Sequence, residues 1–172
     1  MSDDELLRLI VAGHKQAFIK LYDRYRARLF TYCCRMIGDR ERARDALQEA
    51  FLKAYQNAAM YQEGTNVGAW LFRLTRNVCI DMLRARKEHE SIDEMQLPAR
   101  EYDADVMLQD ALTDEIERLP EIYREAVILR DVQGHTYDEI AKITGTAIST
   151  VKFRIFKARD TLRQRLVTYL PD

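Results

Sequence analysis

The apolar positions in the first 90 residues predict a series of α-helices. They recur three and four positions apart, which is the spacing that places side chains on one face of a helix. A first short run ends at Gly13, a second ends at Gly38, a third begins near Asp39, and a fourth follows a polar loop at residues 61–68. We therefore expect this part of the chain to form a helical bundle.

The second half is expected to be helical as well. Residues 91–107 lose the apolar repeat and turn acidic, so they are interpreted as a flexible linker. From residue 108 the repeat returns, and Pro120 suits the first turn of the next helix, where an N–H donor is not needed. The residues expected to face inward are Leu108, Leu112, Ile116 and Leu119, followed by Ala126, Val127, Leu129 and Val132. The pattern predicts an all-α chain with two small helical domains, residues 1–90 and residues 108–172.

Composition and charge support this interpretation. Six Gly and three Pro in 172 residues are few for a turn-rich sheet protein, and 47% hydrophobic residues can build a core. The net charge of −1 does not by itself indicate a nucleic-acid binder. The distribution of charge along the chain is more informative than the total, because two mildly basic blocks flank an acidic one: residues 1–90 carry +4, residues 91–120 carry −7 and residues 121–172 carry +2.

The cysteines and histidines predict no special chemistry. The three cysteines, Cys33, Cys34 and Cys79, are an odd number without a CxxC pair, which favours a reducing cytoplasm over a disulfide scaffold. Cys33 and Cys34 lie in a core-like run, so we expect no redox role for them. The three histidines are scattered, and we expect neither a metal site nor a cofactor. No signal peptide and no membrane span are expected either.

Residues 136–165 have the pattern of a helix-turn-helix. Thr136 and Glu139 have the spacing of a capping box, and Gly145 is placed for a sharp turn with a positive φ. The small residue at the helix contact, the glycine at the turn and the branched residue behind the second helix have the required spacing. The residues expected to face inward are Ile140, Ala141, Ile148, Val151 and Ile155.

The second of these helices is expected to expose a basic face. Residues 152–165 hold six Lys/Arg against the single acid Asp160, and this charge can neutralise phosphates in a major groove. A plain amphipathic hairpin with a solvated basic face is the alternative. Phe153 and Phe156 lie between the cations, and solvent alone gives no reason for exposed aromatic rings at these positions.

Several motifs resemble the extracytoplasmic-function sigma factors of bacterial RNA polymerase. Residues 137–141, 149–152 and 157–159 resemble their region 4, and residues 45–55 and 70–84 resemble their region 2. The resemblance covers nearly the whole chain, with the motifs in the right order. The chain departs from the family pattern at four positions, which bear on the promoter sequence it would read: Val67, Ser149, Phe153 and Lys157.

The resemblance implies three sets of functional residues. The polymerase-binding set, which would contact the clamp coiled coil of the largest subunit, is Asp45, Gln48, Glu49 and Leu52. The set for the promoter −10 element is Tyr61, Gln62, Thr65, Trp70, Arg73, Arg76, Asn77 and Arg84. The set for the −35 element is Thr150, Lys152, Phe153, Phe156, Lys157 and Arg159. Ordinary helix surface is the alternative for the polar residues of the first set, and the core is the alternative for Leu52 and Trp70.

The implied function is transcription initiation with a choice of promoter. The implied partners are core RNA polymerase, through its clamp and its flap, promoter DNA, and an anti-sigma factor. Two other classes of protein stay open. A free-standing helix-turn-helix regulator would need a dimerisation surface, and the chain has neither coiled-coil heptads nor a sensor domain. An enzyme would need a phosphate loop, a nucleophile elbow or a cluster of metal ligands, and the sequence has none of these motifs.

Overall fold

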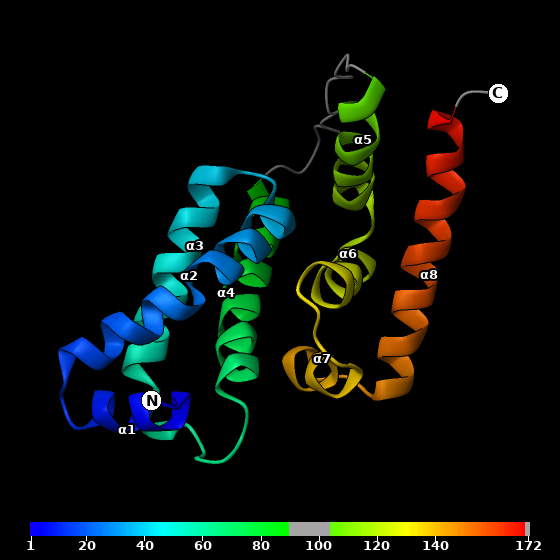
Figure 1. Ribbon diagram of the computed structural model, residues 1–172. Coiled ribbons are helices and arrows are strands. Elements are labelled where there is room, and N and C mark those ends of the chain that lie inside the picture. The colour runs from blue at the N-terminus through cyan, green and yellow to red at the C-terminus, as the bar shows by residue number, and fades with distance from the viewer. Residues whose placement is uncertain (90–103, 171–172) are drawn as a thin grey trace.

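The computed structural model describes residues 1–89 and 104–170, and only the backbone of residues 104–108. The described residues form helices joined by short turns, without a β-strand (Figure 1). The elements of the first half are α1 (Asp3–Val11), α2 (Lys15–Ile37), α3 (Arg40–Gln56), η1 (Ala58–Met60) and α4 (Val67–His89). Those of the second half are α5 (Ala104–Arg118), α6 (Glu121–Val127), η2 (Ile128–Val132), α7 (Tyr137–Thr144), α8 (Ile148–Leu166) and η3 (Val167–Tyr169).

In the first half, α2, α3 and α4 pack on one another around an apolar core, and α1 lies against α2. The turn between α2 and α3 follows the sequence prediction. Gly38 has φ 75° and ends α2, while the Asp39 side chain accepts hydrogen bonds from the next backbone N–H groups and begins α3. A capping box between Ser2 and Glu5 begins α1, although the sequence analysis did not name it.

In the second half, α7 and α8 form the expected helix-turn-helix, and α5 and α6 pack against α8. Gly145 has φ 70° at the turn, as expected. Four residues of α8 form a buried stripe that faces this half's core: Val151, Ile155, Ala158 and Leu162. Only half of the capping box is present. Thr136 accepts from the backbone N–H of Glu139, but the Glu139 carboxylate contacts Nδ1 of His135, 2.9 Å away.

Three residues expected to face inward are exposed instead. Leu112 and Val132 are each 37% exposed, and Ile148 is 40% exposed. The reason for Val132 is a π-helical turn, η2, which follows α6. Such a turn holds an extra residue, so the side chains toward its end, where Val132 lies, are rotated away from the face that an α-helix would give them. Ile148 is the first residue of α8, before the helix reaches the core.

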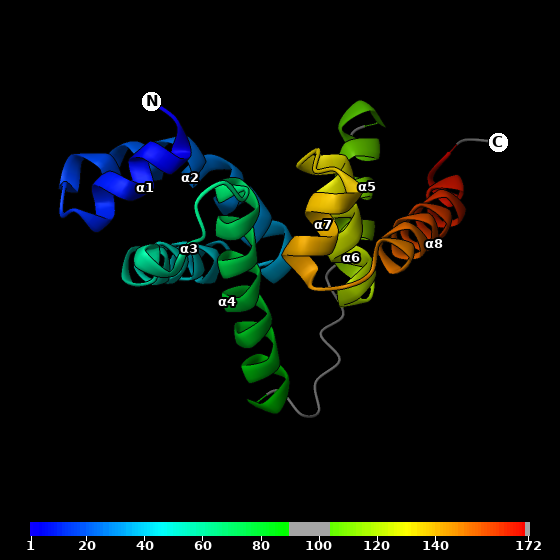
Figure 2. The same cartoon turned by 90° about the horizontal axis from the view of Figure 1, so that it is seen from below.

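The two halves lie side by side. Views along two directions place the second half next to α2 and α4, and α4 packs directly against α7 (Figures 1 and 2). Most of the expected linker, residues 91–107, lies outside the described residues, and its last four positions belong to α5. Among the helices described, none is long and apolar enough to cross a bilayer.

Candidate nucleic-acid and partner interfaces

The outer face of α8 carries the residues expected to read the −35 element. Phe153 is 58% exposed and Phe156 is 66% exposed, and Lys152 and Lys157 are exposed beside them. Thr150 is half-buried at the start of the helix. The buried stripe lies on the opposite side of α8, so the helix presents two cations and two aromatic rings outward. This face suits a DNA groove, because cations meet phosphates and rings meet thymine methyl groups or sugars.

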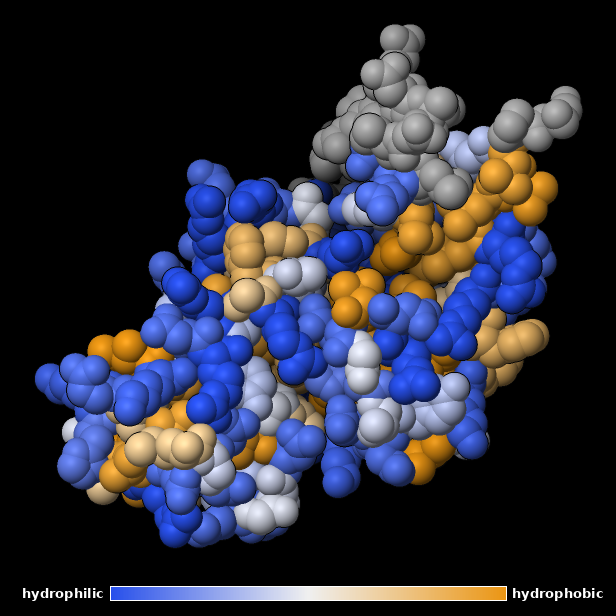
Figure 3. All heavy atoms as spheres, in the orientation of Figure 1, coloured by the Kyte–Doolittle hydropathy of each residue, from blue (hydrophilic) through white to orange (hydrophobic). Residues whose placement is uncertain are grey.

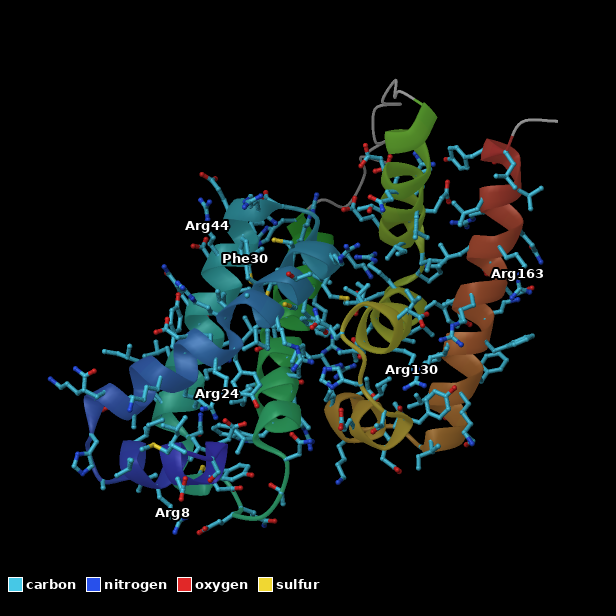
Figure 4. The ribbon with its side chains drawn as sticks, viewed as in Figure 1. Arg8, Arg24, Phe30, Arg44, Arg130 and Arg163 are labelled. Atoms are coloured by element: carbon cyan, nitrogen blue, oxygen red, sulfur yellow. The ribbon has the colours of Figure 1, made fainter. Side chains whose placement is uncertain are left out.

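The ring of Tyr137 lies between two cations beside this face. The Lys152 ammonium lies 5.7 Å from the ring centroid, and the Arg130 guanidinium, labelled in Figure 4, lies 4.7 Å from it. Arg130 also donates to the carbonyl oxygen of His135 at 2.8 Å. Cation–π contacts of this kind hold the start of α8 against α7 and η2.

Arg159 belongs to the expected −35 set, but an internal carboxylate holds it. Its Nε and Nη2 donate to the two carboxylate oxygens of Asp131, at 3.0 and 2.5 Å. A planar guanidinium bound in this two-pronged way has its position fixed. In this arrangement Arg159 lies against η2 and its charge is neutralised.

The loop before α4 is ordered by its own hydrogen bonds. Tyr61 Oη donates to the carbonyl oxygen of Thr65 at 2.5 Å, and Thr65 Oγ1 donates to that of Gln62 at 2.8 Å. The Asn66 side chain accepts from the backbone N–H of Ala69 and so supports the start of α4. Tyr61 packs on Trp70 with 5.3 Å between ring centroids, and both rings are half-buried. Trp70 therefore fits both alternatives given for it, a core residue and a residue of the −10 set, because it packs on the core and keeps part of its surface exposed.

On α4, the structure divides the expected −10 residues into two groups. Arg73, Asn77 and Arg84 are exposed and lie on one stripe, because they are four and seven positions apart. Arg76 lies off this stripe and turns toward the second half, where its Nε lies 2.7 Å from Oε1 of Glu125. Arg76 is therefore set apart from the other residues of α4 that were expected at the −10 element.

All four residues of the expected polymerase-binding set are exposed on α3. Leu52 is 56% exposed, which removes the core alternative for this residue, while Leu47 and Phe51 are buried. Next to Leu52 the structure adds a groove of about 520 Å³ between α2 and α3, and the sequence analysis missed it. Its apolar wall is formed by Phe18, Ile19, Tyr22, Phe51, Leu52 and Tyr55. The sequence signal that could have indicated this groove was the apolar pair Leu52 and Tyr55, which lies next to the buried face of α3 and is exposed.

The same face continues along α2 and α3. A second groove, of about 450 Å³, includes Phe30, Arg44 and Gln48 among its lining residues. Figure 4 shows Phe30 and Arg44 close together on neighbouring helices. An apolar surface with Arg44 at its edge and acids nearby on α3 is suited to a protein partner.

Another apolar groove, of about 550 Å³, lies between α5, η2 and the end of α8. It appears in Figure 3 as an orange band between α5 and α8. Leu112 and Val132, which were expected to be buried, line it together with Val167 and Leu170. The ion pair of Asp131 and Arg159 lies at its edge. These misassigned residues therefore line an open apolar groove.

The structure also brings two cysteines together. Cys33 and Cys79, 46 residues apart, have their sulfur atoms 3.7 Å from each other in the core of the first half. The hydrogen bond to Cys33 and burial raise the pKa of the Cys79 thiol. A thiol with a raised pKa is a poor nucleophile. Within the described ranges, no three His, Cys, Asp or Glu side chains gather as ligands of a metal ion.

Comparison with known proteins identifies the family. Residues 21–89 match Sigma-70 region 2, and residues 109–162 match Sigma-70, region 4. The chain is 36% identical to the ECF RNA polymerase sigma factor SigM of Mycobacterium tuberculosis, over 98% of this chain and 86% of that protein. It is 29% identical to SigW of Bacillus subtilis, over 93% of this chain and 94% of that protein. The chain belongs to the extracytoplasmic-function sigma factors of the sigma-70 family, and it is a transcription initiation factor rather than an enzyme.

Solved structures agree on the fold of both halves. CnrH, in complex with the cytosolic domain of CnrY, has a TM-score of 0.77 at 22% identity and covers 96% of this chain and 97% of its own. The sigma factor RpoE of Bartonella quintana, in complex with the anti-sigma factor NepR, has a TM-score of 0.74 at 25% identity. That match covers 87% of this chain and 96% of RpoE.

Proposed function

We propose that this chain directs core RNA polymerase to promoters by reading two separate DNA elements. The exposed face of α8, with Phe153 and Phe156 between Lys152 and Lys157, carries the proposal. This helix would lie in the major groove at the −35 element, with its buried stripe toward the protein. The two lysines can donate to base acceptors or phosphates, and the rings can press on thymine methyl groups.

The −10 element would be held by α4 and the loop before it after the strands separate. Arg73 and Arg84 provide cations for the backbone, and Asn77 between them can pair with the edge of an exposed base. The ordered loop offers the stacked pair Tyr61 and Trp70, with Gln62 and Thr65 exposed next to it. A base that has left the stack needs an aromatic or polar pocket of this kind.

Binding to polymerase would use α3 and the groove beside it. Asp45, Gln48 and Glu49 offer polar contacts, and Leu52 offers an apolar one at the edge of the groove. The groove between α5 and α8 is a second docking surface, suited to an apolar helix of the polymerase flap or of an anti-sigma factor. Anti-sigma control is an inference from relatives, since RpoE was solved with an anti-sigma factor. The chain would act in the cytoplasm, with the polymerase.

The test compares −35 preference for three alanine variants of the chain assembled with core polymerase. Lys152→Ala and Phe156→Ala should each lower transcription from the preferred sequence and relax the preference at one position, by about 1–3 kcal/mol per lost base contact. Lys142→Ala, which removes an exposed lysine of α7, is the matched control and should change neither.

Wild-type preference and transcription in both α8 variants would refute α8 as the reader. Specific binding to duplex DNA by the chain alone, without any gain from polymerase, would instead favour the free-standing regulator.

A further inference from the structure

The loop before α4 is held by helix α1 as well as by its own hydrogen bonds. Oδ1 of Asp4 in α1 accepts a hydrogen bond from the backbone N–H of Gly64 in the loop, 3.3 Å away. Gly64 has φ 85°, which side chains other than glycine rarely adopt, so the loop turns sharply at this residue. One turn further along α1, Nε of Arg8, labelled in Figure 4, lies 3.3 Å from Oε1 of Glu63. Helix α1 therefore contacts the loop at two successive residues.

A second set of contacts fixes the place where the loop enters α4. The hydroxyl of buried Tyr25 in α2 donates to Oδ2 of Asp3 in α1 at 2.5 Å. The other carboxylate oxygen of Asp3 pairs with Arg24. Gly68, the second residue of α4, packs closely here, because a Cβ atom at this position would lie 3.1 Å from Tyr25 Oη and 3.2 Å from Oδ1 of Asn66. Tyr25 thus connects α1 to the start of α4.

The three acids in the first turn of α1 have separate partners. Glu5 completes the capping box with Ser2, so it stays with its own helix. Asp3 binds α2, Asp4 binds the loop, and both side chains are half-buried. The helix itself is anchored in the core by three buried side chains, those of Leu6, Leu7 and Ile10. A contact with Asp4 therefore ties the loop to a fixed part of the fold.

Polar contacts decide where the loop lies relative to α1. A cleft of about 180 Å³ remains beside the loop, and its lining includes Asp4, Tyr61 and Glu63, so apolar packing does not fill the space between them. The hydrogen bond from Tyr61 Oη to the carbonyl oxygen of Thr65 joins the two ends of the loop, and Asp4 holds its middle. A carboxylate near an anionic strand repels its phosphates, so Asp4 would help DNA binding only by placing the loop.

We propose that α1 positions the loop for the −10 element, and that Asp3 and Asp4 are positioning residues for recognition of a base there. Asp4 sets the middle of the loop through Gly64, and Asp3 sets the start of α4 through Tyr25. A loop that already has its binding conformation loses less conformational freedom when a base enters, which strengthens the preference for the correct base. This inference rests on the proposed function, because it assigns the loop to the −10 element.

Two variants at one position separate the hydrogen bond from the charge. Asp4→Ala removes the acceptor for the Gly64 N–H, whereas Asp4→Asn keeps an oxygen that can accept it and removes only the charge. The full-length variants, assembled with core polymerase, transcribe a promoter library that is randomised at both the −35 and the −10 element. The matched control is Asp23→Ala, which removes an exposed acid of α2 whose partner Arg26 lies on the same helix, 3.5 Å away.

Asp4→Ala should lower the preference for one base at the −10 element about fivefold, which corresponds to the loss of one hydrogen bond. The −35 preference and the affinity for core polymerase should stay unchanged. Asp4→Asn and the control Asp23→Ala should keep the wild-type preference. Tyr25→Phe, which removes only the hydroxyl bound to Asp3, should weaken the −10 preference as well. Circular dichroism confirms that each variant keeps its helices, and Tyr25→Phe decides the matter where Asp4→Ala loses its fold.

Wild-type −10 preference in Asp4→Ala would overturn the proposal, and so would an equal loss in Asp4→Ala and Asp4→Asn. A loss at both promoter elements together would also overturn it, because a general change in the fold would then be the cause. Where Asp4→Ala does not fold, wild-type preference in Tyr25→Phe has the same consequence. A wild-type chain without any −10 preference would instead overturn the proposed function, and the positioning role with it.

Discussion

Asp131→Asn should turn Arg159 from an internal partner of η2 into a DNA contact. In the wild type, both donor atoms of one edge of the guanidinium are bound to Asp131, and the pair lies beside the exposed residues of α8 that are proposed to contact DNA. An amide at position 131 removes the negative charge and one of the two acceptors. Arg159 can then reach a phosphate, which carries a full negative charge.

The size of the effect follows from the exposure of the pair. The Arg159 and Asp131 side chains are 44% and 39% exposed, so breaking the pair costs at most about 1 kcal/mol of folding free energy. One added phosphate contact makes the slope of log affinity against log salt steeper by about 0.9. Between 50 and 200 mM salt, the variant should therefore lose affinity about 3.5-fold more than the wild type, and it should gain affinity at low salt.

The assay measures binding of duplex DNA that carries the −35 element, by the chain assembled with polymerase, at several salt concentrations. Sequence preference should stay unchanged, because a phosphate contact does not distinguish bases. The control is Asp131→Asn combined with Arg159→Ala, in which the steeper slope should disappear. The reasoning is refuted by an unchanged slope in Asp131→Asn. A slope that becomes shallower by a full unit in Arg159→Ala alone would also refute it, because Arg159 would then already contact phosphate.

Two other predictions concern the −10 site and the contact between the two halves, where the His135 ring packs on Phe72 of α4. Asn77→Ala should lower the yield of open complex about fivefold, which corresponds to the free energy of one hydrogen bond, with little change in initial binding. Permanganate footprinting measures this yield, and an equal yield from the variant and the wild type would contradict the prediction. His135 should make this contact sensitive to acid: burial lowers its pKa below the ordinary 6.5, Glu139 of α7 raises it, and Arg28 of α2 lowers it. The packing of the two halves on each other therefore loses stability as pH falls through about 6.5. Burial raises the pKa of Glu125, so protonation of this carboxylate stabilises the packing as pH falls, which opposes the effect of His135. The comparison is therefore with His135→Phe, in which only the effect of Glu125 remains. Between pH 7.5 and 5.5, small-angle scattering should show that the radius of gyration of the wild type increases relative to that of His135→Phe. Parallel curves for the two proteins would exclude the histidine as the cause of any acid sensitivity.

The parts of the fold that the sequence predicted depend on short-range patterns. The boundary at Gly38 and Asp39, the turn at Gly145 and the buried stripe of α8 each follow from residues within one or two turns of a helix. The exposed rings of Phe153 and Phe156 followed from that stripe, since they lie on the opposite face. Local spacing was therefore sufficient to locate the expected recognition helix.

The errors arise where tertiary structure overrides the local pattern. Val132 has the right spacing for a core residue, but the π turn rotates it into the groove. Glu139 has the spacing of a capping box, but a neighbouring histidine binds its carboxylate. Arg76 and Glu125 are 49 residues apart, and no helical repeat connects two positions on separate helices. The sequence could assign Arg76 a cationic role, but it could not show that an acid of the second half binds it.

The π turn η2 connects the exposed face of α8, which is proposed to read DNA, with the groove between α5 and α8. Its Asp131 holds Arg159 beside the exposed residues of α8, and its Val132 lines the groove between α5 and α8, where the same ion pair also lies. A protein bound in this groove would therefore contact the ion pair that holds Arg159. By thermodynamic linkage, if such a partner changes the affinity of the chain for DNA by some factor, bound DNA changes the affinity for the partner by the same factor. If α8 reads DNA as proposed, the five residues of η2 would make the groove an effector site for this helix as well as a place of attachment.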